Sequence, residues 1–373
     1  MTTLSKVRSL VVTATSENQP EAFSTMVQSN SVGKNLIING AMQVAQRGTS
    51  ATGLGASSGY FTVDRINFGS SGTSAGRFTM TQTADGPSGF ANCLKLDCTT
   101  ADASVAATEW EYLQYSVEAQ DLQRLGFGSS DAESFVLSFY VKGNAAATYT
   151  IGAYQVDANR WMAQTFSVTS SWNRVSLLWP KDVSGSIADD NGTGMSFYLT
   201  LQVGTNFTSG SVPATWETLD TTDIADSGQT QFFDSTSRTL SITGLQMEIG
   251  DVATAFEHES FAETLQKCER YFQRFVAGAN YTGFSVAFST GATSAKATLK
   301  FNGKMRAAPT ITQSNTGFNY GPQVAFSSFN TLYTGLDTSW IDMNIGSVGS
   351  AGQLGIWNGN NNGAAYIQMD AEL

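Results

Sequence analysis

Charged residues are scarce in this chain of 373 residues. Asp, Glu, Lys and Arg make up only 14% of it, whereas about a quarter is usual for a globular protein. The net charge is −11, and the sequence contains no basic block. Because phosphate groups are bound by clustered Lys and Arg, we expect no nucleic acid as a partner. No apolar run approaches the ~20 residues of a membrane-spanning helix, so we expect no membrane insertion either.

Histidine and cysteine are almost absent as well. A single histidine, His258, lies between two glutamates in "FEHES", which excludes zinc sites built on several histidines and favours a structural role. The cysteines are Cys93, Cys98 and Cys268; an odd number predicts buried or half-buried free thiols and synthesis in a reducing cytoplasm. Phosphate-binding loops and common hydrolase motifs are missing. We therefore expect a protein that is not an enzyme.

Carboxylates leave two alternatives open. A pair of them could act as in a glycosidase, and the candidates are Asp64, Glu109, Glu111, Asp182, Asp189 and Asp190. The stretch "ADDNG" could hold Ca²⁺ through carboxylate and carbonyl oxygens, but it lacks the spacing of an EF-hand and is typical of a turn. We expect no cofactor. Ca²⁺ is the one alternative, and no specific motif supports it.

Short strands dominate the rest of the sequence. Apolar and polar residues alternate in "GYFTVDRINFGS", "SFVLSFYVKGN" and "GMSFYLTLQVG", among roughly ten such segments before residue 250 that are separated by turn residues. Even spacing of this kind predicts a jelly-roll β-sandwich. Alternation resumes after residue 276 and predicts a second, smaller β-sandwich domain. The fold class is therefore all-β.

One segment has helical periodicity instead. Phe261, Leu265, Cys268 and Phe272 recur on one stripe, and Ser260 precedes Glu263 by three residues, which is the spacing of a capping box. We expect this helix to end near Arg274, with Leu265, Phe272 and Phe275 as its buried anchors. The predicted divisions are an N-terminal arm at 1–34, the jelly roll at 35–258, the connecting helix at 259–275 and the distal β domain at 276–373.

Exposed aromatic side chains beside amides would suit a sugar, because rings stack on sugar faces and amides both donate and accept hydrogen bonds. One candidate is "GIWNGNNNGAAY" near the end of the chain, with Trp357, Asn358 and Asn360. Another is "YQVDANRW", with Tyr154 and Trp161 at a hairpin. In "WEYLQY", Trp110, Tyr112 and Gln114 share one face of a strand. Each aromatic could instead fill a core.

Several stretches together resemble a known family. They are "NLIINGAMQVAQRGTS", "GYFTVDRINF", "SFVLSFYVKG", "SIADDNGTGMSFYLTLQVG", "ITGLQMEIGDVATAFEHESFAETLQKCERYFQRF" and, more weakly, "KMRAAPTIT". The combination resembles the virion appendage proteins of tailed bacteriophages of the marine and environmental type, whose jelly roll is like that of carbohydrate-binding modules. The chain departs from the family pattern at Ala45, where Trp is usual, which leaves open whether a sugar or Ca²⁺ site of that type is retained.

The resemblance implies a tail fibre subunit that is located in the virion and takes part in host attachment, with host surface polysaccharide as the ligand. It also implies a homotrimer and docking of residues 1–34 on other virion proteins of the tail or its adaptor. The alternatives are a head fibre or decoration protein and, from the enzyme class, a glycan depolymerase. With an anchored N-terminus, ligand binding is expected in the distal domain at Trp357.

Overall fold

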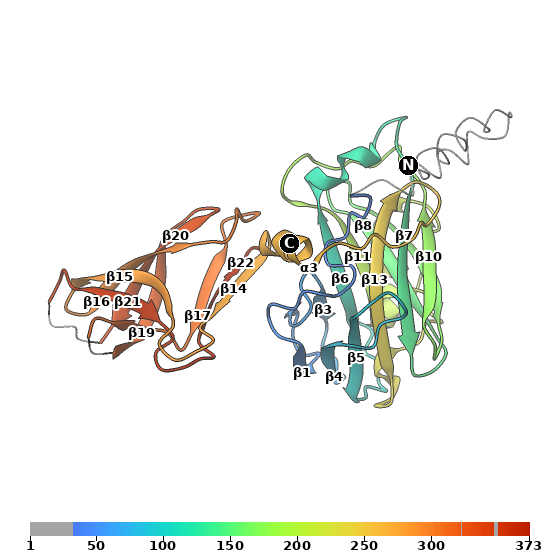
Figure 1. Cartoon of the computed structure of the whole chain (residues 1–373). Helices are drawn as coiled ribbons and strands as arrows, with labels where there is room; N and C mark the ends of the chain where they lie inside the picture. The colour runs from blue at the N-terminus through green and yellow to red at the C-terminus, as the bar shows by residue number, and fades with distance from the viewer. Residues whose placement is uncertain (1–32, 322, 347–349) are drawn as a thin grey trace, which may run out of the picture.

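The computed structural model describes residues 33–321, 323–346 and 350–373. The expected N-terminal arm, 1–34, lies outside these ranges except for its last two residues. The described chain consists of two β units with one α-helix between them (Figure 1). The predicted all-β class with a linking helix is therefore confirmed.

The larger unit is a sandwich of two antiparallel sheets. In its order across the sheet, the six-stranded sheet comprises β1 (Ser50–Leu54), β4 (Arg77–Thr83), β5 (Cys93–Thr100), β13 (Thr239–Ile249), β7 (Phe135–Gly143) and β10 (Asn173–Trp179). The seven-stranded sheet comprises β12 (Glu217–Thr218), β9 (Arg160–Val168), β8 (Ala147–Gln155), β11 (Thr193–Val203), β6 (Trp110–Glu118), β3 (Asn67–Ser71) and β2 (Gly59–Tyr60). Short 3-10 helices lie in the connections, namely η1 (Ala119–Leu125), η2 (Thr205–Phe207), η3 (Thr221–Asp223) and η4 (Phe232–Asp234).

Strict alternation along the strands builds the sandwich core. In β6, Leu113 and Tyr115 point inward and are buried, while Tyr112 and Gln114 point outward. The same period of two places Phe197 and Leu199 of β11 inside. The core is continuous from one sheet to the other, so each sheet has only one face left for solvent or ligands.

The helix α3 (Phe261–Glu269) begins as the sequence predicts. The Ser260 side chain accepts from the backbone N–H of Glu263, and the Glu263 carboxylate accepts from the N–H of Ser260, so the capping box is complete. The helix ends five residues earlier than expected, because the chain turns into β14 (Phe272–Val276). Phe272 is buried as predicted, whereas Leu265 and Phe275 are only half-buried and Phe261 is 55% exposed.

The smaller unit combines a three-stranded sheet with a closed barrel. The sheet has the order β14, β22 (Tyr366–Asp370) and β17 (Thr310–Ser314). The barrel has the order β15 (Gly283–Gly291), β16 (Ser294–Lys300), β20 (Thr338–Ile345), β19 (Gln323–Thr334), β18 (Gly317–Asn319) and β21 (Leu354–Asn358). Alternation alone does not distinguish a barrel from a sandwich, since both have one buried face per strand.

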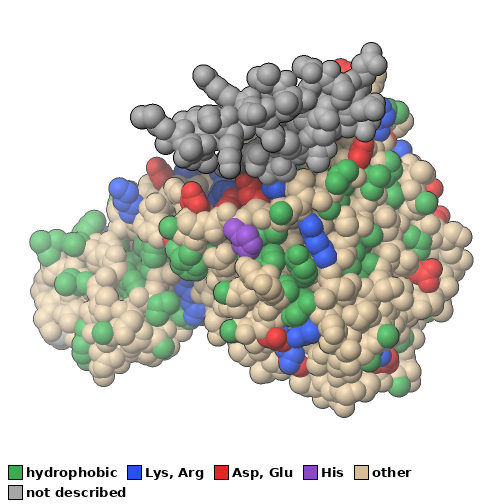
Figure 2. All heavy atoms as spheres, turned by 45° about the vertical axis from the view of Figure 1, so that its right-hand side comes forward, with side chains coloured by type: hydrophobic (Ala, Val, Ile, Leu, Met, Phe, Trp, Pro, Cys, Tyr) green, Lys and Arg blue, Asp and Glu red, His purple; other side chains and the backbone are tan. Residues whose placement is uncertain are grey.

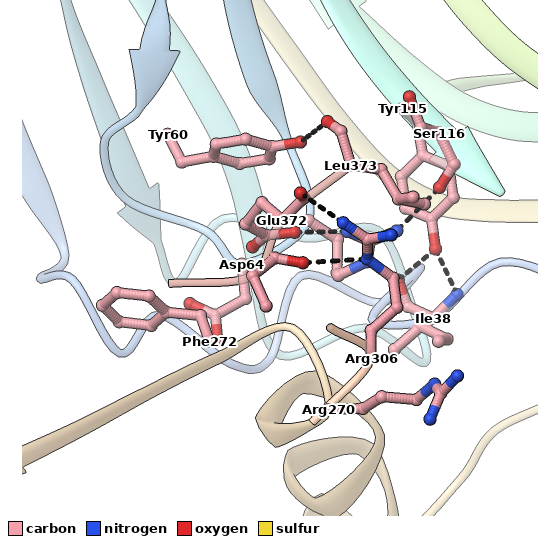
Figure 3. A network of polar contacts seen from close by, with 12 residues as sticks. Ile38, Tyr60, Asp64, Tyr115, Ser116, Arg270, Phe272, Arg306, Glu372 and Leu373 are labelled. Atoms are coloured by element: carbon pink, nitrogen blue, oxygen red, sulfur yellow. Dashed lines mark hydrogen bonds and ion pairs between the residues drawn. The ribbon is translucent and has the colours of Figure 1, made fainter. Parts of the chain in front are cut away.

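Arginines hold the two units together at the end of the chain (Figure 3). Arg65 is 1% exposed, forms an ion pair with Glu372, and lies 3.5 Å from the ring centre of Tyr271. Arg47 adds ion pairs to Asp370 at 3.0 Å and to Glu372 at 3.3 Å. The last strand of the smaller unit is therefore bound directly to the sandwich.

A second set of contacts lies beside the first. Arg270, just after α3, forms two hydrogen bonds of 2.8 and 2.7 Å with the carboxylate of Glu118 at the end of β6. Arg306 donates to the carbonyl of Asn191 at 2.6 Å, and the Asn191 amide donates to the carbonyl of Arg306 at 2.6 Å. The smaller unit thus contacts one end of the seven-stranded sheet, at the end of β6 and just before β11.

The molecular surface is poor in charge, as the composition requires. Figure 2 shows a face on which neutral polar side chains and backbone dominate, with hydrophobic side chains scattered over both units. Within the described ranges, α3 and the other helices are all too short or too polar to cross a bilayer.

The burial of Phe272 predicts a large effect of its truncation. Phe272→Ala should lower the free energy of unfolding by about 3–5 kcal/mol, because a buried ring is lost and a cavity is left. Phe261→Ala, on the exposed side of α3, is the matched control and should change it by less than about 0.5 kcal/mol. Urea titration followed by near-ultraviolet circular dichroism measures both. Equal effects of the two substitutions would contradict the burial of Phe272 at the start of β14.

The Arg65–Glu372 pair predicts a large loss of stability when one partner is neutralised. Glu372→Gln should lower the free energy of unfolding by about 3–5 kcal/mol, because the buried guanidinium keeps its charge and loses its ion pair. Asp234→Asn breaks the more exposed pair with Arg238 and should lower the free energy of unfolding by less than about 1 kcal/mol. Amide hydrogen exchange in β22 should speed up in Glu372→Gln alone. Unchanged exchange there would mean that the pair does not hold the units together.

Candidate functional site: the aromatic outer face of the seven-stranded sheet

The outer face of the seven-stranded sheet carries a cluster of half-buried aromatic and amide side chains. They come from neighbouring strands, because β6 pairs with both β3 and β11, and β11 pairs with β8. We call this cluster the aromatic face; it comprises Asn67, Trp110, Tyr112, Gln114, Tyr154 and Tyr198. All six are partly accessible and point away from the sandwich core.

The rings of the aromatic face lie close enough to form one surface. The ring centres of Trp110 and Tyr112 are 4.4 Å apart, those of Tyr112 and Tyr198 5.1 Å, and those of Trp110 and Tyr198 5.5 Å. Phe207, from η2, borders Trp110 at 5.7 Å. Such contacts hold each ring in place before a ligand arrives, which lowers the entropy cost of binding.

Two glycines let aromatic rings lie flat on the sheet. A Cβ at Gly69 would be 2.1 Å from the Tyr112 ring, and a Cβ at Gly152 would be 2.0 Å from the Trp161 ring. Both glycines belong to the outer face, since Gly69 pairs with Tyr112 and Gly152 pairs with Tyr198. A side chain at either position would push the ring outward, so the glycines set the shape of the face.

Amides and hydroxyls accompany the rings. The Gln114 Nε2 atom donates to the Tyr198 hydroxyl at 3.2 Å and lies 3.3 Å from the Ser196 hydroxyl. Asn67 is the register partner of Gln114 on β3, and its Oδ1 atom is shielded from solvent without a hydrogen-bond partner among the described residues. The aromatic face therefore presents amide and hydroxyl groups beside its half-buried rings.

The hydroxyls of Tyr112 and Tyr198 stay neutral at physiological pH. Burial, helped by the neighbouring Tyr112, raises the pKa of Tyr198 to about 12. Burial and the nearby Glu111 carboxyl raise the pKa of Tyr112 as well. Both hydroxyls can therefore donate and accept hydrogen bonds, but neither supplies a charge.

A cluster of buried acids lies behind the face, at the same end of the sheet. Glu111 is fully buried and accepts a 2.8 Å hydrogen bond from Ser70, and a bulge in β11 places Gln202 opposite it. Gln202 in turn donates to Glu109 at 3.0 Å. Burial, together with the negative charges of the nearby Glu109 and Asp102, raises the pKa of Glu111 to about 8. The cluster points into the sandwich and not toward the aromatic rings.

Of the two aromatics predicted at the hairpin, Tyr154 is partly accessible, whereas the expected exposure of Trp161 is wrong. Tyr154 belongs to the aromatic face, and its hydroxyl donates to Asn159 at 2.9 Å. Trp161 is not at a loop tip: it lies in β9, is 1% exposed, and is covered by Ile224 and Ala225 of the segment that crosses the sheet. Its indole N–H donates to the carbonyl of Asp223 at 3.3 Å. Trp161 supports the aromatic face from one side.

The expected exposure of Trp357 is wrong. It lies in β21, is fully buried inside the barrel, and contacts the rings of Phe284, Phe326 and Phe329. Alternation explains this, because in β21 Ile356 points outward and the next residue must point inward.

The asparagines beside Trp357 build a turn. Asn358 is 1% exposed and exchanges amide hydrogen bonds of 3.0 and 3.1 Å with Gln323, and it also accepts from the N–H of Asn360. Asn360 is half-buried and has a positive φ of 44°, which asparagine tolerates. These residues shape the end of the barrel, and a buried Trp357 presents no ring to a ligand.

Other candidate residues have structural environments. Asp190 accepts from the N–H of Gly192 at 2.8 Å, as in a turn. Among the described residues, no three or more acidic, His or Cys side chains lie together so that they could hold a metal ion. His258 packs between Phe90 and Phe256. Cys93, Cys98 and Cys268, all within the described ranges, are buried free thiols as predicted.

A cavity inside the sandwich core is small and apolar. It measures about 40 Å³ and is lined by residues such as Met42, Leu113 and Phe197. A groove of about 480 Å³ opens at the far edge of the seven-stranded sheet, beside Met162, Leu178 and Val212, but it lacks a comparable group of rings. The aromatic face is therefore a better candidate for a binding site than the cavity or the groove, because its rings and amides lie together and are accessible.

The sequence predicts only part of this face. Trp110, Tyr112 and Gln114 are predicted to share one side of a strand, and they do. Tyr198 and Asn67 are not singled out from the sequence. A signal for Tyr198 exists in "MSFYLTL", where Ser196, Tyr198 and Thr200 alternate with Phe197 and Leu199. An aromatic in the polar phase of a strand indicates a ring on the solvent side.

The fold and the site define a β-sandwich with an accessible aromatic face. No protein-family model matches the chain, and no curated protein sequence matches it. Among solved structures, the enzymatically active domain of tailspike protein 4 from bacteriophage CBA120 is similar at 12% identity and a TM-score of 0.29. The similar region is 58% of this chain but only 21% of that one.

Two carbohydrate-binding modules are similar to a comparable degree. A family 11 module from Clostridium thermocellum, in complex with a mixed-linked tetrasaccharide, has 10% identity and a TM-score of 0.27, over 56% of this chain and 98% of the module. A family 30 module has 11% identity and a TM-score of 0.29, over 62% and 95%. At these values, function has to be argued from the residues of the chain itself.

Glu111 predicts a pH-dependent stability. Its pKa is about 8 in the folded chain and about 4.3 in an unfolded one, so unfolding releases a proton between these values. The free energy of unfolding should fall as the pH rises from about 4.5 to about 8, by up to about 1.4 kcal/mol per pH unit. Glu111→Gln should flatten this slope and raise stability at pH 8. Urea titrations at several pH values measure it, and an unchanged slope in Glu111→Gln would contradict the assignment.

Proposed function

We propose that the chain binds a neutral glycan on the aromatic face. The observation that carries the proposal is the juxtaposition of Trp110, Tyr112 and Tyr198, held 4.4 to 5.5 Å apart on an accessible sheet, with two amides at their edge. Sugar rings have apolar C–H faces that stack on aromatic rings, and their hydroxyls need partners that both donate and accept. The tyrosine hydroxyls and the amides of Gln114 and Asn67 meet that need without charge.

Binding without catalysis fits the side chains of this face. Hydrolysis of a glycosidic bond requires two carboxyl groups on either side of the bond. The six residues of the aromatic face include neither Asp nor Glu, and the nearby Glu109 and Glu111 are buried and turned toward the sandwich interior. A glycan depolymerase therefore remains the alternative with less support, and Ca²⁺ the cofactor with no specific motif behind it.

We further propose that the protein is a bacteriophage tail fibre subunit that attaches the virion to host surface polysaccharide. The combined sequence stretches that resemble phage appendage proteins support this role. In it, residues 1–34 dock on other virion proteins, and three copies assemble into a fibre. A head fibre or decoration protein is the second candidate, because the same resemblance fits either position on the virion. Antibody labelling of phage particles in the electron microscope separates these two.

Truncation of the aromatic face tests the glycan proposal. Tyr112→Ala and Tyr198→Ala should each weaken binding to host polysaccharide roughly tenfold or more, equivalent to at least about 1.4 kcal/mol. The reason is that each substitution removes a stacking surface and disturbs its neighbour. Isothermal titration calorimetry with purified polysaccharide fragments measures the affinity.

Tyr333→Ala is the matched control, since Tyr333 is a tyrosine on the barrel and is 72% exposed. It should leave the affinity unchanged. Equal loss in all three variants, or no loss in either variant of the aromatic face, would contradict the proposed site. Release of reducing ends during the incubation would favour the depolymerase.

A further inference from the structure

Four hydrophobic side chains lie unprotected on the outside of the barrel. Val286 and Phe288 belong to β15, and Leu354 and Ile356 belong to β21; they are 68%, 42%, 74% and 49% exposed. The two strands are paired so that Val286 opposes Ile356 and Phe288 opposes Leu354. The four side chains therefore form one contiguous patch, which we call the barrel patch. Single exposed apolar residues are ordinary, but a contiguous patch marks a surface that binds a protein or a membrane.

A lysine and a tryptophan border the barrel patch. On β16, Lys296 is the register partner of Phe288, and its Nζ atom lies 5.4 Å from the ring centre of Trp340 on β20. Trp340 is partly exposed, although it lies in the interior of a strand. The lysine stem thus lies beside two accessible rings. Apolar surface and a cation therefore occur side by side on neighbouring strands.

This combination favours a lipid surface over a protein partner. Lysine is depleted in the centre of protein–protein interfaces, because its charge would have to leave water. At a bilayer surface, the long stem of a lysine lies along apolar groups while the ammonium reaches the headgroups. Tryptophan prefers the same depth, because its ring is apolar and its indole N–H is polar. A sugar is a poor occupant, since the four residues of the barrel patch have neither amides nor hydroxyls.

The distribution of charge favours contact of the barrel with an anionic surface. Residues 283–358 contain four Lys or Arg, two Asp and no Glu, which gives this segment a charge of +2. Because the total is −11, the rest of the chain carries −13. The barrel extends away from the sandwich (Figure 1). A negatively charged bilayer would therefore repel the sandwich and attract the barrel, so that the barrel meets the surface first.

We propose that the barrel patch binds the surface of a bilayer that contains anionic phospholipid. The four apolar side chains and the Trp340 ring enter the boundary between headgroups and acyl chains, and Lys296 contacts headgroup phosphates. The barrel lies on the bilayer and does not span it, which agrees with the expected absence of membrane insertion. Lipid binding by the barrel does not depend on glycan binding by the sandwich.

Flotation of the full chain with vesicles tests the proposal. The parent protein should float with vesicles of three parts phosphatidylcholine and one part phosphatidylglycerol, and added salt should weaken the binding. The double variant Leu354→Ser/Ile356→Ser should bind roughly tenfold more weakly, because two apolar anchors are lost. The matched control is Val183→Ser/Val252→Ser, which alters two valines of the sandwich that are 53% and 63% exposed. It should bind as the parent does.

The variant Lys296→Gln tests the contribution of the cation. It should weaken binding to the same vesicles roughly fivefold and make the binding less sensitive to salt, because one contact with headgroup phosphates is lost. Lys181→Gln is the matched control, since Lys181 is an exposed lysine of the sandwich. It should leave the binding unchanged.

Near-ultraviolet circular dichroism checks that the barrel stays folded in each variant. If the double variant loses its spectrum, the single variant Leu354→Ser replaces it and should also weaken binding. A parent protein that does not float, folded variants of the patch that bind as the parent does, or an equal loss in the controls would overturn the proposal. Sedimentation without vesicles adds one further outcome: a parent oligomer that the patch variant dissociates, with no vesicle binding by either, would assign the patch to a second copy and not to lipid.

Discussion

The relative placement of the two units depends on a buried guanidinium, that of Arg65. Arg65 has a positive φ of 74°, which is unfavourable for a residue with a side chain. The cost is offset because this conformation places the guanidinium on the ring of Tyr271 and against the carboxylate of Glu372. One residue of the sandwich thereby binds both the strand that enters the smaller unit and the strand that leaves it.

The same region connects the unit boundary with the aromatic face. The guanidinium of Arg65 donates to the carbonyl of Ser116, whose hydroxyl lies 2.8 Å from that of Ser196 and close to Gln114. Glu118, at the end of the same strand, binds Arg270. The contacts that fix the smaller unit, at Ser116 and Glu118, thus follow directly after Gln114 and the rings along β6. A shift of the smaller unit would therefore be transmitted to Gln114 through two hydrogen bonds, from Arg65 to Ser116 and from Gln114 to Ser116.

Sequence patterns predict the parts of this molecule that depend on local periodicity. The sandwich strands, the capping box at Ser260 and the shared side of Trp110, Tyr112 and Gln114 all follow from spacing of two or three residues. Trp357 is a residue that local pattern predicts wrongly. Its Asn- and Gly-rich surroundings suggest a loop, whereas it lies in a strand of five residues that precedes the turn. Trp161 shows a second limit: the segment that covers it comes from residues 204–226, and contacts between distant segments are not encoded in local pattern. The membership of Tyr198 and Asn67 in the aromatic face depends on strand order, which the sequence does not reveal.

The pairing of β14 with β22 has a consequence for how this molecule can change over evolution. Val276, the last residue of β14, opposes Tyr366, the first residue of β22, so the chain leaves for the barrel and returns from it at adjacent points. The barrel strands lie between these neighbouring ends, whereas β17 and Arg306, which bonds with Asn191 of the sandwich, belong to the support. Insertions of that kind can be lengthened, shortened or exchanged while the supporting strands keep their pairing. The architecture therefore allows the barrel to be exchanged without loss of the sandwich, α3 or the arginine contacts.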